Sequence, residues 1–360
     1  MRHAGHIVML VAGIIFLFFP SVHAESDKTY PTIKPTGFIQ GWWWYDETPG
    51  PNHAENYKIA RARIGIKGDL SSLVDYLVLT EWGRLTYNDP CTLVDAWVNF
   101  KFDPALNVKI GQTWYKFTLS GTTPIPAIPL IYRPEVVDGI WLPMGRVGAY
   151  SYDRGIEVSG NFKDIAMPVG YIVSVTTGAG LDHFEDNGKK DFTGRFYVEP
   201  LKGLQLGCSG FYGYSRVSMT SNLKNEIKED LPEYAYGLEA SYTHKYFRVI
   251  SEYLEGRYEG YYQSNGRETF HQATQRPRGW YALIGLKPVS WIEIPLQYAW
   301  YEKDAVQSDT GLQTYTVGLT WWFKENSLHN LKVNYIIRSA ERNYGSKPRN
   351  MIAVQMQFAF

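Results

Sequence analysis

The chain has 360 residues, of which 44% are hydrophobic, 20% charged and 16% aromatic. A mean hydropathy of −0.29 is too polar for a bundle of membrane helices, and the apolar and aromatic content is too high for a disordered chain. Because 36 basic side chains balance 36 acidic ones, no global field attracts nucleic acid, which is not expected as a partner. The length suggests two domains or one large closed architecture.

Residues 1–24 read as a cleaved secretory signal. Arg2 lies in a short polar head, an apolar run occupies 7–19, and Ala24 precedes Glu25. The alternative, a transmembrane anchor, needs ~20 apolar residues. We therefore expect a signal peptide at 1–24 and a mature domain at 25–360.

The two cysteines, Cys91 and Cys208, fall in a predicted loop and in the middle of a predicted strand. This placement is poor for a disulfide, so free thiols are expected. Two isolated cysteines also exclude a Cys-ligated zinc site and covalent haem attachment, and no cofactor is predicted.

Beyond the signal, apolar and polar residues alternate with a period of two almost everywhere, which predicts an all-β chain. In the last strand, for example, Val354, Met356 and Phe358 alternate with Gln355 and Gln357. Sixteen strands are predicted, at residues 35–46, 57–69, 73–86, 93–102, 105–117, 148–161, 168–178, 191–200, 203–216, 234–245, 246–258, 278–288, 290–303, 311–324, 328–339 and 349–360.

The predicted connections alternate between short turns, such as 103–104, and long loops, such as 118–147, 217–233 and 259–277. An even strand number with both termini at the short-turn rim is typical of a transmembrane antiparallel β-barrel in a Gram-negative outer membrane. Strands in lipid must close on themselves, so one barrel domain is expected. A soluble β-sandwich or propeller is the alternative, but neither explains a last strand with an aromatic end and charge on one face only.

Several stretches resemble the phosphate-selective porin O and P family of Gram-negative outer membranes. They are residues 60–70 (ARARIGIKGDL), 94–106 (VDAWVNFKFDPAL), 108–112 (VKIGQ) and 153–157 (DRGIE). The closing residues 358–360 (FAF) resemble the terminal signature by which such chains are taken up for membrane insertion. Phe360 is therefore the expected assembly signal, with the barrel assembly machinery as its partner.

The resemblance implies a sixteen-stranded, homotrimeric, solute-conducting pore whose third long loop folds inward, set in outer-membrane lipid and lipopolysaccharide. The chain departs from the family after Gly111 and Gln112, where a basic residue would lead into Pro-Phe. Here residues 113–117 read TWYKF. The resemblance thus implies the channel without its phosphate-capturing cluster.

A row of basic residues, Arg61, Arg63 and Lys67, shares one face of the second predicted strand. An arginine facing lipid near mid-membrane would cost ~2–4 kcal/mol, so this face is expected to look into the pore. Two interpretations of Arg61 and Arg63 stay open. They either guide anions or are wall residues neutralised by Asp75, Glu81 or Asp95.

The same reasoning places Asp95 and Lys101 inside on the fourth predicted strand, with Val94 outside, and Lys109 is the next predicted pore-lining residue. The predicted lumen as a whole mixes both charges. It therefore favours a weakly selective pore.

The connection 118–147 is rich in proline and apolar residues, so it is expected to avoid water and to form no regular strand. Its charged residues are Arg133, Glu135, Asp138 and Arg146. We interpret it as a constriction loop inside the barrel. The alternative is an outer flap that covers a neighbour in a trimer.

The function predicted from these features is passive diffusion of small hydrophilic solutes or ions, with a preference for anions or phosphate left open. A structural or adhesive barrel that supports a surface or electron-transfer partner is the alternative. No enzyme is predicted, because the histidines lie in separate connections and no Gly-x-Ser-x-Gly elbow occurs.

Overall fold

A computed structural model describes residues 29–47, 55–83, 91–141, 151–181, 185, 188–220, 226–263, 270–323, 328–344 and 350–360. The predicted signal at 1–24 lies outside these residues. The strands are β1 (Lys34–Asp46), β2 (Glu55–Asp69), β3 (Val74–Glu81), β4 (Thr92–Asp103), β5 (Leu106–Trp114), β6 (Tyr152–Phe162), β7 (Val169–Thr176), β8 (Asp191–Leu201), β9 (Leu204–Thr220), β10 (Glu226–Thr243), β11 (Phe247–Gln263), β12 (Phe270–Gln275), β13 (Arg278–Val289), β14 (Ile292–Glu302), β15 (Gly311–Trp322), β16 (Asn330–Ala340) and β17 (Met351–Ala359).

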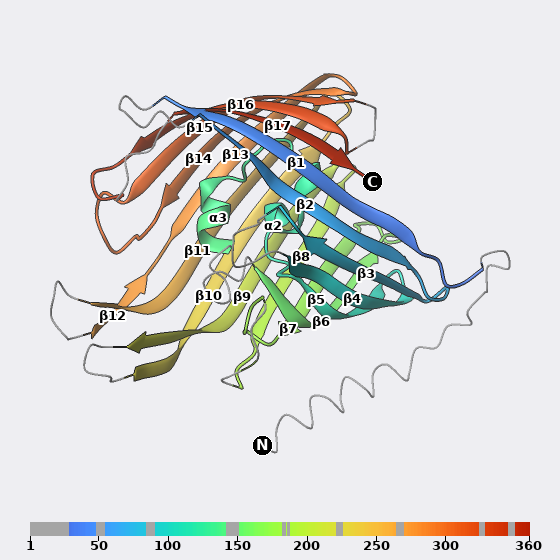
Figure 1. Ribbon diagram of the computed structural model, residues 1–360, viewed down its shortest axis with the longest axis horizontal. Helices are drawn as coiled ribbons and strands as arrows, with labels where there is room; N and C mark the ends of the chain where they lie inside the picture. Colours follow the sequence, from blue (N-terminus) through green and yellow to red (C-terminus); the bar gives the residue numbers. More distant parts are fainter. Residues whose placement is uncertain are drawn as a thin grey trace.

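The sheet closes on itself. Consecutive strands pair antiparallel, and β17 returns to β1 in a register that runs from Phe38 opposite Ala359 to Asp46 opposite Met351. Both β12 and β13 pair with successive parts of β11, so they are two halves of one strand interrupted at Pro277. The predicted closed antiparallel barrel of sixteen strands is therefore confirmed (Figure 1).

The observed strands match the predicted ranges to within a few residues over most of the chain, but β9, β10 and β11 are longer. They have 17, 18 and 17 residues, whereas crossing a membrane takes ~9–11. The predicted loops 217–233 and 259–277 are thus largely strand, and this part of the prediction was wrong. Antiparallel pairing continues past the membrane because each long hairpin satisfies its own backbone, as in β9 with β10.

The outer face of the wall carries apolar side chains and the inner face carries polar ones. This distribution is the inverse of that in a soluble protein. Exposed apolar side chains such as Ile64 and Val317, 48% and 50% accessible, alternate with buried polar ones such as Thr316, Asn334 and Gln357. Apolar side chains face outward at no cost only if the surroundings are apolar too. This pattern is the one expected of a barrel whose outer face meets lipid.

A β-bulge changes one predicted face. The pairing of β3 with β4 shifts register between Leu79 and Thr80, and the extra residue is Val94. We expected Val94 on the outer face, but it is 4% accessible and packs with Leu79 and Tyr152. A bulge cannot be read from alternation, since it breaks the alternation.

Three short helical turns occupy the connection between β5 and β6. They are α2 (Leu119–Thr122), the 3₁₀ turn η1 (Ile125–Ala127) and α3 (Glu135–Trp141). As predicted, the proline-rich part adds no strand. No helix in the described ranges is long and apolar enough to cross a membrane.

The last residue completes the seam of the barrel. The backbone N–H of Phe360 donates to the carbonyl of Gly37 at 2.9 Å, and the N–H of Gly37 donates to the carbonyl of Phe360 at 3.0 Å. The side chain of Phe360 is 57% accessible, and its ring lies against Gly37, where a Cβ atom would come within 3.0 Å of it.

We expect Phe360→Asp to impair assembly far more than Ala359→Asp. The charge at 360 would lie on the outer face beside the seam, whereas the neighbouring residue alternates to the inner face. The measurement is the fraction of folded, heat-modifiable protein in the outer membrane. Equal and normal levels of both variants would show that Phe360 has no special role in assembly.

Candidate functional site

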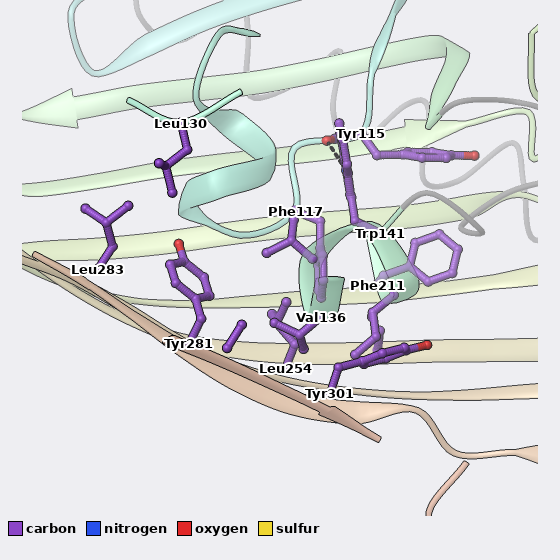
Figure 2. Close-up of a cluster of buried hydrophobic side chains, with 14 residues drawn as sticks. Tyr115, Phe117, Leu130, Val136, Trp141, Phe211, Leu254, Tyr281, Leu283 and Tyr301 are labelled. Atoms are coloured by element: carbon purple, nitrogen blue, oxygen red, sulfur yellow. Dashed lines mark hydrogen bonds between the residues drawn. The ribbon is translucent and has the colours of Figure 1, made fainter. Parts of the chain in front are cut away.

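The segment 115–141 packs against the inner face of the wall. Its apolar side chains form a buried cluster with inward residues of β9, β10, β11, β13 and β14 (Figure 2). Val136, Val137 and Ile140 of α3 are fully buried, and burying each such side chain contributes ~1.5–3 kcal/mol. The segment brings Tyr115, Phe117, Leu130, Val136, Val137, Ile140 and Trp141 to the cluster, and the wall brings Phe211, Ala235, Leu254, Tyr281, Leu283, Ala299 and Tyr301.

Polar wall residues of β15 to β17 hold the proline-rich part of this segment. Asn334 accepts the backbone N–H of Ile131 at 2.8 Å. The amine of Lys332, 1% accessible, donates to the carbonyl of Ile128 at 2.6 Å, and the amide of Gln357 donates to the carbonyl of Pro126 at 3.1 Å. Backbone groups that prolines leave without a regular ladder are thus satisfied by side chains of the wall.

Glu252 of β11 holds the start of α2. Its two carboxylate oxygens accept the backbone N–H groups of Leu119 at 3.0 Å and Ser120 at 2.9 Å, and the hydroxyl of Tyr281 donates to it as well. Glu252 thus satisfies two backbone N–H groups that the start of a helix leaves without a partner in the helix.

The charged residues of the segment have distinct surroundings. Arg133 donates to the carbonyls of Ser120 at 3.2 Å and Thr123 at 3.0 Å, and its guanidinium lies 5.0 Å from the centre of the Trp141 ring. Glu135 accepts from Arg338 of β16 at 3.2 Å. Asp138 lies half-buried on α3, and Arg146 falls outside the described residues.

The predicted basic row of β2 lies on the inner face. Arg63 is 6% accessible and forms an ion pair with Glu81 at 2.9 Å, and it donates to the hydroxyl of Tyr152 at 2.7 Å. Arg61 donates to Gln40 at 2.9 Å. Lys67 is exposed, and no ion pair involving it occurs in the part of the chain that the structure describes.

The other predicted pore-lining residues are largely matched by opposite charges. Lys101 lies between Asp69 at 2.9 Å and Asp75 at 3.5 Å. Lys109 pairs with Glu157 at 2.8 Å. Asp95 is 1% accessible, and Lys116, Arg63 and Lys109 act on it electrostatically.

A cavity of about 400 Å³ lies between this wall and the segment. Arg63, Lys67 and Asp95 line it from the wall, and Arg133 and Trp141 line it from the segment. The structure thus brings two of the predicted wall cations together with one predicted cation of the segment. It places Lys101 and Lys109 elsewhere, outside the cavity lining.

Two ionisable groups of the β5–β6 connection titrate near neutrality. Burial lowers the pKa of Lys116 to about 7, while the carboxylates of Glu157 and Asp95 oppose this shift. Loss of hydration raises the pKa of Asp138 to about 6, while Arg133 opposes the shift. Both groups therefore change charge between about pH 8 and 5.

The sequence did not predict the wall residues that form hydrogen bonds with the segment, above all Glu252 and Asn334. Both lie on the polar face of predicted strands, and this is the only signal that the sequence offers. That signal marks a residue as inward-facing but does not say which loop it will meet. Within the described residues, no group of three or more His, Cys, Asp or Glu side chains is placed to hold a metal ion.

Comparisons with known proteins agree with this architecture. A family model described as phosphate-selective porin O and P matches residues 43–195, which confirms the resemblance predicted from the sequence. No curated protein matches the chain.

Solved porins share the fold at low identity. OmpF of Salmonella typhi, solved in complex with daunomycin, has 11% identity and a TM-score of 0.64 over 91% of this chain and 97% of that one. An anion-selective porin from Comamonas acidovorans has 12% identity and a TM-score of 0.64, with 91% and 99% covered. OmpT of Vibrio cholerae in its trimer form has 12% identity and a TM-score of 0.61, again with 91% and 99% covered.

The family match and the porin fold together support a passive channel in the outer membrane of a Gram-negative cell. This family and this fold are those of channels rather than enzymes.

Glu252→Ala should loosen the segment and raise the single-channel conductance, because two backbone N–H groups at the start of α2 lose their hydrogen-bond acceptor. Glu255→Ala is the matched control, since Glu255 lies on the opposite face of the same strand and accepts from Tyr236 and Tyr253. If both variants conduct like the wild type, Glu252 does not determine the position of the segment.

Anion preference should increase as the pH falls from about 8 to 5. Lys116 gains a positive charge below a pKa of about 7 and Asp138 loses its negative charge below about 6, so both changes make the lumen more positive. The zero-current potential in a KCl gradient measures this shift. In Asp138→Asn, the preference at pH 8 should already be higher and should depend less on pH. A selectivity that stays flat across this range in the wild type contradicts the assignment.

Proposed function

We propose that this porin-like barrel is a passive channel for small hydrophilic solutes that prefers anions. The proposal rests on one observation, the convergence of Arg63 and Lys67 of the wall with Arg133 of the segment around one cavity. A confined passage with cationic walls concentrates anions and repels cations.

The distribution of ion pairs supports an anion preference despite the neutral composition. Most inward cations of the described wall are matched closely, for example Lys109 by Glu157 and Arg195 by Glu239 at 2.9 Å. Around the cavity, Arg133 donates to carbonyl oxygens, which carry no net charge, and Lys67 is exposed. The cavity lining thus has three cations, Arg63, Lys67 and Arg133, against one acid, Asp95, although Glu81 pairs with Arg63.

We further propose that the segment 115–141 is the constriction loop. Its support is the buried apolar cluster with β9 to β14 and the hydrogen bonds to Asn334, Lys332 and Glu252. An outer flap, the alternative interpretation, would leave these inward wall residues without their partners. The passage would then run through the cavity that the segment and strands β1 to β6 line together.

The remaining expectations extend this proposal to assembly. We propose cleavage of residues 1–24, insertion through the barrel assembly machinery by way of Phe360, and contact of the outer face with lipid and lipopolysaccharide. A homotrimer is supported by the likeness to a porin described in trimer form. Small anions and other small solutes are the proposed cargo.

The double substitution Arg61→Ala with Arg63→Ala should shift the zero-current potential in a KCl gradient toward cations, most strongly at low salt. Two cations leave the wall, and Glu81 stays behind with a negative charge. The matched control is Arg257→Ala with Arg278→Ala, since these arginines pair with Glu259 and Glu302 and are more exposed. Unchanged selectivity at low salt would mean that Arg61 and Arg63 are neutralised wall residues.

A further inference from the structure

The walls of the 400 Å³ cavity are mainly apolar and aromatic. The wall contributes Phe38, Leu77, Leu79, Trp114 and Tyr152, and the segment contributes Trp141. Its volume lies within the ~300–1,000 Å³ of sites that hold small organic molecules. Such a lining is unusual for a passage that is meant for hydrated ions alone.

The cations of the cavity lie beside aromatic rings. The guanidinium carbon of Arg133 is 5.0 Å from the centre of the Trp141 ring. That of Arg63 is 5.6 Å from the Tyr152 ring and 5.7 Å from the Phe38 ring. Positive charge and flat apolar surface therefore lie together in the lining of one cavity.

This combination disfavours an inorganic anion as the best solute. Phosphate or chloride would lose water against Leu77 and Leu79 and would gain no apolar contact in return. A carboxylate on an aromatic or short aliphatic body meets both requirements. Its charge faces the cations while its body buries apolar surface against the wall.

We propose that the preferred solutes are small carboxylates with an aromatic or apolar body. This inference deepens the proposed function and rests on it. It names the cargo of the same passage, with Lys67 and Arg133 as the anion contacts and Leu77 as part of the apolar wall.

Asp95 is the one acidic residue of the described part that lines the cavity, and its charge does not make the net charge of the lining negative. Three cations, Arg63, Lys67 and Arg133, line the same space. Asp95 is 1% accessible and interacts with Lys116, Arg63 and Lys109. The negative charge of Asp95 is thus mainly compensated by these basic neighbours.

The test uses the purified full-length mature protein in planar bilayers, with sodium benzoate, acetate and phosphate as probes and benzamide as the uncharged analogue. Benzoate should interrupt the chloride current at a concentration about 2- to 10-fold lower than acetate does, the factor expected for one aromatic contact. Phosphate and benzamide should interrupt it less than benzoate. Equal effects of benzoate and acetate would overturn the inference while leaving the channel intact.

Two substitutions separate the apolar contact with the body of the solute from the contact with its carboxylate. Leu77→Asn should lower the ratio of benzoate to acetate effects toward one, and Lys67→Gln should weaken block by both carboxylates. The matched control is Lys287→Gln, because Lys287 lines a different cavity beside Glu293 and should leave benzoate block unchanged. A wild-type protein that forms no conducting pore would overturn the proposed function, and the inference with it.

Discussion

The pairing of the last strand with the first is the constraint on which the rest of the structure depends. Lipid offers no hydrogen-bond partner, so a free edge between β1 and β17 would leave a row of backbone groups unsatisfied. The register from Phe38 and Ala359 to Asp46 and Met351 removes that edge. Closure also requires an even number of membrane crossings when both ends lie at one rim. Short turns then collect at that rim and long connections at the other, and the alternation of side chains gives an apolar outer face and a polar inner face.

A closed polar wall leaves a lumen, and in the proposed function the segment between β5 and β6 partly fills it. Such an arrangement is possible because one side of the wall carries apolar side chains. Inward positions of β9 to β14 carry Phe211, Leu254, Tyr281, Leu283 and Tyr301. Around this apolar patch, Glu252 and Asn334 satisfy backbone groups that short helices and prolines leave open. The main buried cluster of the segment is thus with β9 to β14, and the cavity lies beside β1 to β6, where the basic row of β2 lies.

The architecture was predictable from the sequence because its physics is local. A period of two, turn residues and the cost of a charge in lipid depend on near neighbours, and they predicted the sixteen strands. The failures have non-local causes. Val94 faces inward because the β3–β4 register slips, β9 to β11 extend because their partners extend, and Pro277 splits a strand that remains paired with β11. The hydrogen bond between Leu119 of the segment and Glu252 joins residues 133 positions apart, and no local sequence pattern encodes such a contact.

A chain with no net charge can still distribute its charges unevenly, because closure of the barrel decides which charged side chains lie next to one another. Adjacent strands place opposite charges side by side, as in Lys109 with Glu157 and Arg195 with Glu239, and such pairs cancel at a distance. Arg133 of the segment is held instead by the carbonyls of Ser120 and Thr123. Among the described residues it interacts electrostatically with Asp138 but forms no ion pair, so its charge is matched less closely than those of the wall cations. The same segment brings Trp141, and the passage gains charge and apolar surface from a single insertion. Selectivity would then depend on how firmly the segment is anchored as well as on the wall residues themselves.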